Sequence, residues 1–181
     1  MKNASHTPEE SRWVLPSRIA LPVLMCWLMA FTLGQSTNTA VAPAPEALVI
    51  IVNKANPVGT LSTEELRRYF RLERERWPDG RKNTVVMLPS GTPERDTVLR
   101  QIYNLPVGEL NRYFLQATFA GQVHSAPKEL ASTVNMLKFV FNVPGAIGYV
   151  RAGAVDDTVK VVRIDGRLPG DPDYLLKLSS P

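Results

Sequence analysis

Residues that hold metal ions or form disulfides are nearly absent from this sequence. Among 181 residues there is one cysteine, Cys26, and there are two histidines, His6 and His124. A disulfide framework and a zinc site built from cysteine and histidine are therefore excluded. We expect no metal ion and no other cofactor.

The motifs of common enzyme classes are missing as well. The sequence contains no G-x-x-x-x-G-K-[ST] nucleotide loop, no H-E-x-x-H metalloprotease motif and no G-x-S-x-G hydrolase motif. Residues 125–128 match S-x-x-K, but Pro127 does not suit the helix start that such a serine nucleophile needs, and the companion motifs are absent. His124 is predicted to lie on the surface. The sequence therefore predicts a protein that is not an enzyme.

Charge of one sign does not dominate the chain. The 21 lysines and arginines and 17 acidic residues give a net charge of +4. The arginines of residues 67–76 are interleaved with glutamates, so no sustained positive stripe forms and no nucleic-acid partner is expected. With 44% hydrophobic and 21% charged residues, the composition is that of a globular protein, and the length suits one domain.

The first 34 residues have the order of a secretory signal. Residues 1–18 are polar and carry three basic side chains, and residues 19–34 carry no charge at all. Sixteen helical residues reach about 24 Å, which is less than the bilayer core of about 30 Å. A cleaved signal therefore fits better than a retained N-terminal membrane anchor, although both remain open. Either one predicts a periplasmic or otherwise exported protein.

The rest of the chain divides into a linker, a domain and a tail. Cleavage is expected after Gly34 or after Ala42, and residues 35–46 are rich in alanine and proline, as in a short linker. We expect an α/β domain at 47–168 and a C-terminal tail at 169–181. The tail is expected to pack loosely, although Tyr174, Leu175, Leu176 and Leu178 give it apolar side chains with which to dock.

Apolar, β-branched runs alternate with amphipathic stretches from residue 47 onward. The run at 47–52 predicts a strand buried on both faces, of the kind found in parallel sheets. In the first helix, Arg67, Arg68 and Arg71 are expected to point away from the apolar face, into solvent. Together the patterns predict strands at 47–52, 84–88, 146–150 and 159–164, and helices that begin at Ser62, Thr92, Glu109 and Ser132. Strands separated by helices predict the α/β class, with a mixed sheet flanked by helices.

One segment has the features of a binding site. Ser90, Gly91 and Thr92 lie between the end of a predicted strand and the start of a helix. The two side-chain hydroxyls, the glycine that allows a ligand to approach the backbone, and the unpaired amides of the first helical turn therefore come together. Arg95, one turn into the helix, is placed to add a charge-assisted hydrogen bond. This arrangement predicts a site for a small anion. The alternative is a capped turn, with Thr92 as the cap and Arg95 in solvent.

The order of four segments resembles phosphate-type periplasmic substrate-binding proteins. The segments are residues 49–58, residues 61–80 with the turn Trp77-Pro-Asp-Gly80, residues 84–92 ending in Ser90-Gly91-Thr92, and residues 144–150. The resemblance covers roughly residues 47–165. It implies the periplasmic-binding-protein type II fold, of which this chain is long enough for little more than one lobe, as in short single-lobe members.

The resemblance also implies a ligand and shows a departure. In the family, Ser-Gly-Thr at the helix start binds phosphate oxygens, and this role carries to Ser90, Gly91 and Thr92. An arginine four residues before the serine is normally the main charge clamp, but Val86 stands there; Arg95 is the nearest substitute. The sequence thus predicts an exported protein that binds phosphate or a similar small oxyanion, linked to phosphate uptake or sensing and to a membrane transporter or envelope partner. The alternative is a non-catalytic envelope interaction module that has lost its ligand. The oligomeric state stays open.

Overall fold

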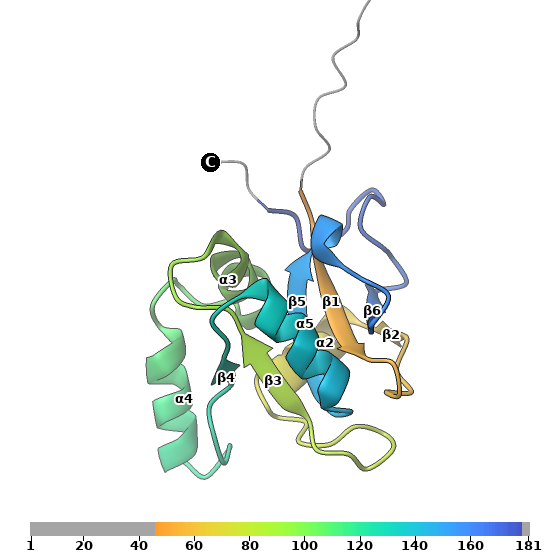
Figure 1. Ribbon diagram of the computed structural model, residues 1–181. Helices are drawn as coiled ribbons and strands as arrows, with labels where there is room; N and C mark the ends of the chain where they lie inside the picture. The colour runs from red at the N-terminus through yellow and green to blue at the C-terminus, as the bar shows by residue number, and fades with distance from the viewer. Residues whose placement is uncertain (1–45, 179–181) are drawn as a thin grey trace, which may run out of the picture. The chain divides into compact units, whose positions relative to one another are not determined.

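Six strands pair into one mixed sheet in the computed structural model, which describes residues 46–178 (Figure 1). The order across the sheet is β2-β6-β1-β5-β3-β4. Strand β1 runs antiparallel to both β5 and β6, whereas β3 pairs parallel with β5 and β4. The strands are β1 Leu48–Asn53, β2 Thr60–Leu61, β3 Thr84–Met87, β4 Lys128–Glu129, β5 Ala146–Arg151 and β6 Val159–Ile164.

The helices begin where the sequence signals predict. Ser62 accepts a hydrogen bond from the Glu65 amide, and the Glu65 carboxylate accepts one in return from the Ser62 amide, which completes the capping box. Thr92 and Ser132 cap the two helices that follow them. The helices are α2 Thr63–Phe70, α3 Pro93–Val98, the π-helical turn η1 Leu99–Tyr103, α4 Leu110–Phe119, α5 Thr133–Asn142 and the 3₁₀ turn η2 Ala152–Ala154.

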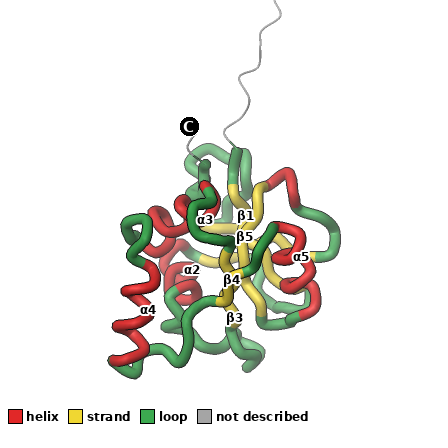
Figure 2. The backbone as a smooth tube through the Cα atoms, turned by 60° about the vertical axis from the view of Figure 1, so that its left-hand side comes forward, coloured by secondary structure: helices red, strands yellow, loops and turns green. Residues whose placement is uncertain are grey.

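Helices cover both faces of the sheet (Figure 2). Neighbouring residues of β5 show this directly, because successive side chains of a strand point to opposite faces. A Cβ added to Gly148 would lie 3.0 Å from the Met136 sulfur of α5. Tyr149 instead faces Phe70 of α2, with ring centroids 6.4 Å apart. The predicted fold class, α/β with a mixed sheet flanked by helices, is confirmed.

Strand β1 is buried along its whole length, as predicted, but its neighbours run differently. The continuous apolar run suggests a parallel-type sheet, and this expectation is wrong for β1, which is antiparallel to both neighbours. Helix α5 packs against β1 and β5 on one face, and on the other face Phe70 of α2 packs against Tyr149 of the neighbouring strand β5. A strand that is apolar on both faces therefore indicates that helices cover both faces of the sheet, and it does not indicate whether the strand is parallel or antiparallel to its neighbours.

Arg67 of α2 and Arg71, which follows its last residue, are half-buried, whereas the sequence predicts that they face solvent. The Arg67 and Arg71 guanidinium groups reach the end of η1, where they donate to the carbonyls of Gln101 at 3.4 Å and Tyr103 at 2.7 Å. These carbonyls lie at the C-terminal end of a helix, where positive charge is favoured. The two side chains therefore join α2 to η1.

The end of the described chain packs on the sheet. Tyr174, Leu176 and Leu178 are buried in the main core, and the Leu176 carbonyl accepts a hydrogen bond from the Leu48 amide at 2.8 Å. Loose packing is therefore wrong for these residues, and the apolar docking is confirmed. The docking surface is the start of β1 in the same chain.

Several predictions fall outside residues 46–178. The signal or anchor at 1–34, its cleavage points, and the linker up to residue 45 belong to the part of the sequence that the structure does not describe. Within the described residues, no helix combines the length and apolar character needed to cross a membrane.

Candidate functional site

The loop that follows β3 is fixed by two buried side chains. The Leu88 amide donates to the Tyr149 hydroxyl at 3.1 Å, and the Leu88 carbonyl accepts from the Arg95 guanidinium at 2.8 Å. Burial raises the pKa of Tyr149 well above its ordinary value, so this hydroxyl stays neutral. Gly91 has a φ of 83°, a left-handed conformation that side chains disfavour. The loop can therefore turn sharply into α3.

The Thr92 hydroxyl forms hydrogen bonds within the loop. The hydroxyl donates to the Pro89 carbonyl at 2.9 Å and accepts from the Arg95 amide at 3.4 Å. Its role is thus the predicted helix cap. A ligand would have to compete with the Pro89 carbonyl for its proton.

Backbone amides of this loop are left without acceptors. Among residues 46–178, no oxygen accepts from the amides of Ser90, Gly91 or Glu94. The Ser90 hydroxyl also has no partner there, and Ser90 is exposed. Unpaired amides at the start of a helix are the usual donors to bound anions. The loop therefore has up to four donors that no acceptor among the described residues uses.

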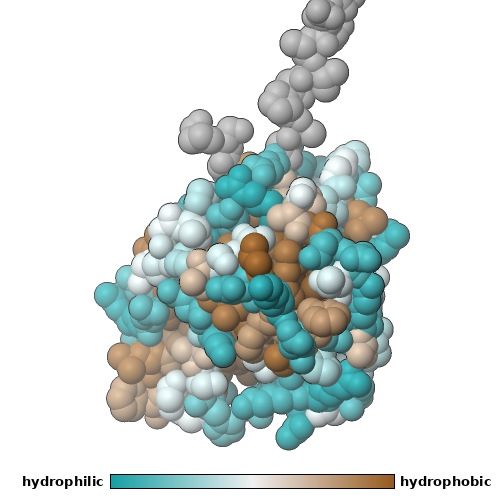
Figure 3. Space-filling model, in the orientation of Figure 1, coloured by the Kyte–Doolittle hydropathy of each residue, from teal (hydrophilic) through white to brown (hydrophobic). Residues whose placement is uncertain are grey.

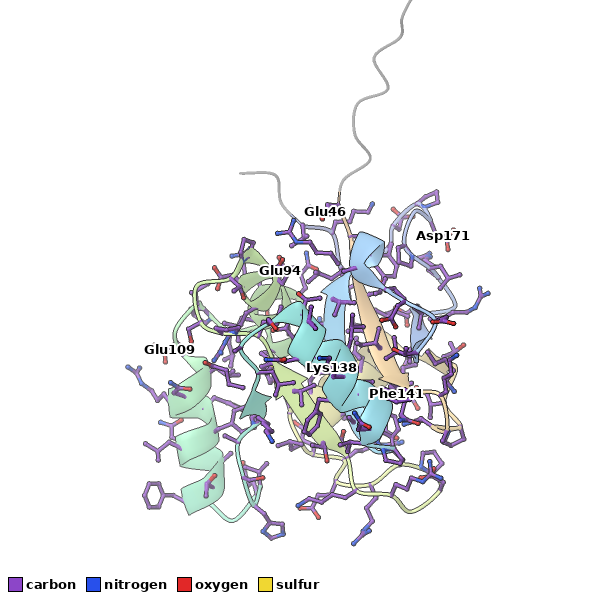
Figure 4. The ribbon with its side chains drawn as sticks, viewed as in Figure 1. Glu46, Glu94, Glu109, Lys138, Phe141 and Asp171 are labelled. Carbon is purple, nitrogen blue, oxygen red and sulfur yellow. The ribbon has the colours of Figure 1, made fainter. Side chains whose placement is uncertain are left out.

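A small pocket of about 90 Å³ is lined by two of these residues, Ser90 and Gly91. One wall comes from the loop and α3, through Ser90, Gly91, Arg95 and Asp96. The other comes from the approach to α4, through Val107, Gly108, Leu110 and Asn111. Figure 4 labels Glu94 and Glu109, which mark the starts of the two helices that flank the pocket.

The charges around the pocket are unusual for an anion site. Arg95 is buried, and its guanidinium is shared between the Leu88 carbonyl and a salt bridge to Glu129 of β4. Glu94 is held by Arg151, whose pKa its carboxylate raises. Asp96 is among the residues that line the pocket, and its Oδ1 is buried without a donor. The residues that line the pocket therefore include both free N–H donors and one acid whose buried oxygen lacks a donor.

The structure gathers Ser90, Gly91 and Arg95 of the predicted residues around the pocket, with Thr92 beside them as the cap. Val86, at the place of the family's arginine, is fully buried in β3. Asp96 and Asn111 were not predicted. An isolated acidic residue next to Arg95 does not by itself indicate a binding site. Asn111 reaches the pocket only because the chain folds α4 against the loop.

The remaining candidates are dispersed. His124 is exposed and lies 3.3 Å from a Glu75 oxygen. Ser125 and Lys128 of the S-x-x-K match lie in a loop and in β4, so the serine does not stand at a helix start. In the described part of the chain, no group of three or more histidine, cysteine or acidic residues is placed to hold a metal ion.

Comparisons with solved structures identify phosphate receptors as similar folds. An ABC-type phosphate transport receptor from Vibrio cholerae has a TM-score of 0.55 and 20% identity, over 68% of this chain and 48% of that one. A phosphate ABC transporter substrate-binding protein with bound phosphate from Clostridium perfringens has a TM-score of 0.54 and 21% identity, over 67% and 46%. PstS from Borrelia burgdorferi has a TM-score of 0.53 and 15% identity, over 68% and 49%.

These similarities concern the fold, because the identities are low. The chain spans about half the length of the receptors that it matches. The sequence matches no family model and none of the curated proteins.

Proposed function

We propose that this protein binds phosphate or a similar small oxyanion in the pocket between the Ser90 loop and α4, as an exported solute-binding protein and not as an enzyme. The observation that carries the proposal is the pair of unpaired amides at Ser90 and Gly91, two residues that line the pocket. The phosphate receptors with a similar fold support the class of ligand. A transporter or another envelope protein is the partner that such a role implies.

The expected affinity is low. If two of these donors form charge-assisted hydrogen bonds to the anion, at about 2 kcal/mol each, they give about 4 kcal/mol of binding free energy. This corresponds to a dissociation constant of about 1 mM. Arg95 adds little while Glu129 holds its guanidinium. The open side of the pocket leaves the anion in contact with water, where charge attraction is weak.

Replacing Ser90 by alanine should weaken phosphate binding about tenfold, because one charge-assisted hydrogen bond is lost. The measurement is a calorimetric titration of the full chain with inorganic phosphate. Ser125→Ala is the matched control, since Ser125 is also an exposed loop serine but does not line this pocket. Phosphate that produces no saturable heat, or that binds Ser90→Ala as tightly as the wild type, would refute the proposed site.

Asp96 should make the site prefer phosphate over sulfate. Its unpaired carboxylate only accepts hydrogen bonds, and near neutral pH hydrogen phosphate can donate one whereas sulfate cannot. We expect sulfate to bind at least about tenfold more weakly, and Asp96→Asn to reduce that difference because an amide can donate. Competition of sulfate against phosphate measures both. Equal affinity of the two anions for the wild type would show that Asp96 does not face the ligand.

A second candidate function is the envelope interaction module without a ligand. Two observations favour it: Arg95 is already neutralised, and α4 exposes large apolar side chains. Leu115 is 58% exposed and Phe119 is 85% exposed, and Figure 3 shows a hydrophobic patch over α4. Such patches are typical of protein contacts. If phosphate fails to bind, this surface is tested by measuring how tightly a transporter or envelope partner binds the wild type and the double variant Leu115→Ser with Phe119→Ser.

A further inference from the structure

A gap in the sheet lies at the opposite end of β3 from the Ser90 loop. Strands β3 and β4 pair at Val86↔Lys128 and Met87↔Glu129. Before these pairs the two segments separate, as Figure 1 shows. The Thr84 amide donates to Gly145 at 2.9 Å, on the β5 side. Because successive amides of a strand point to opposite edges, the Val85 amide points toward the gap.

The Val85 amide has lost its sheet partner. The pairing of β3 with β4 begins only at Val86↔Lys128, and no residue of the loop before β4 accepts a hydrogen bond from the Val85 amide, although Val85 is only 2% exposed. A buried backbone donor without an acceptor is rare and costs free energy comparable to a hydrogen bond. This amide is therefore a ready donor to an acceptor that enters the gap.

The gap forms an open groove of about 170 Å³. Its walls are the residues that lead into β3 and β4, among them Lys82, Asn83, Ser125 and Lys128. A smaller hollow of about 30 Å³ continues it toward His124. Neither lysine forms an ion pair within residues 46–178; the Lys128 ammonium lies 4.8 Å from the centre of the Phe139 ring. Two lysines without an acidic partner among residues 46–178 therefore line the groove.

Asn83 gives the groove a buried acceptor. Its side-chain NH₂ donates to the carbonyls of Tyr69 at 2.8 Å and Arg74 at 3.1 Å, which fixes the orientation of the amide. Its Oδ1 consequently has no donor, although Asn83 is 3% exposed. A ligand that carries a hydroxyl group could supply that donor.

We propose that this groove is a second binding site, for a small organic acid that carries both a carboxylate and a hydroxyl group. The carboxylate accepts from the Val85 amide and from the lysines, and the hydroxyl donates to Asn83. Val85 and Asn83 are two residues apart, which is roughly 6–7 Å along an extended chain. One inorganic oxyanion does not span that length. The site therefore differs from the pocket at Ser90 in both place and ligand.

The test is an amide NMR titration of the full chain with L-malate. We expect saturable shifts at Val85 and Ser125, and at least about tenfold weaker binding when Lys82→Gln and Lys128→Gln are combined. Both lysines are exposed, so the variant should fold, which its amide spectrum verifies. Ser90→Ala should bind malate unchanged, whatever its effect on phosphate.

Two comparison ligands make the test decisive. Succinate lacks the hydroxyl and should bind several-fold more weakly than malate, and inorganic phosphate should not shift Val85. The proposal is overturned if malate leaves the Val85 amide unmoved, if the double lysine variant binds as well as the wild type, or if succinate or phosphate binds the groove equally well.

Discussion

Replacing Gly145 by alanine should destabilise the fold by about 3 kcal/mol, because the new methyl group would collide with backbone. A Cβ at this position would overlap the Lys82 carbonyl oxygen. Backbone at that point cannot move freely, since the Gly145 carbonyl accepts from the Thr84 amide and from the Trp77 indole, both at 2.9 Å. Relief of the collision would disturb both hydrogen bonds.

The measurement is thermal and denaturant unfolding, and we expect the melting temperature to fall by roughly 10 °C. Gly153→Ala is the control, because Gly153 is exposed and a Cβ there meets nothing within 4 Å; its effect should stay within about 0.5 kcal/mol. Equal stability of Gly145→Ala and Gly153→Ala would mean that the approach of Lys82 to Gly145 is not tight in solution.

Gly145 also shows where sequence interpretation stops. Next to Pro144 it indicates the end of a helix, and α5 does end at Asn142. Its second role, close contact with a carbonyl 63 residues earlier in the sequence, depends on how the Trp77 turn folds against β5. Trp77 itself stacks on Tyr69 with ring centroids 4.2 Å apart. No pattern near residue 145 in the sequence predicts that contact.

The elements that were predicted correctly are those with local causes. The capping box at Ser62 and Glu65 and the cap at Thr92 act over three residues, so the sequence is sufficient to place their helices. Strands β2 and β4 were missed because each has two residues, too few for a periodic pattern. They form only because β6 and β3 already offer a free edge.

The candidate site divides in the same way. The turn at Gly91 and the free amides follow from a local strand-to-helix pattern. The ion pair of Arg95 does not follow from a local pattern, because Glu129 is 34 residues away and reaches Arg95 only through the β3–β4 pairing. The sequence left two alternatives, a ligand contact or a solvated arginine. The structure has a third arrangement, a buried arginine that holds the loop.

Replacing Arg95 by alanine should therefore cost about 2 kcal/mol of stability, because the buried Leu88 carbonyl loses its donor. The Glu129 side chain is 54% exposed, so its charge contributes little to that cost. Arg100→Ala is the control, since Arg100 is an exposed arginine on the following turn. Denaturant unfolding compares the two variants. Equal stability of both would mean that Arg95 does not hold the loop.

Glu129→Gln then separates the two roles of Arg95. Glutamine keeps an oxygen that can accept from the guanidinium but removes the charge that competes with an anion. If Arg95 serves only the loop, stability should change by less than about 0.5 kcal/mol and phosphate affinity should not change. If Arg95 also contacts the ligand, phosphate should bind about tenfold more tightly, since one guanidinium charge becomes available to the pocket. We expect the tighter binding, because Arg95 lines the pocket while it pairs with Glu129.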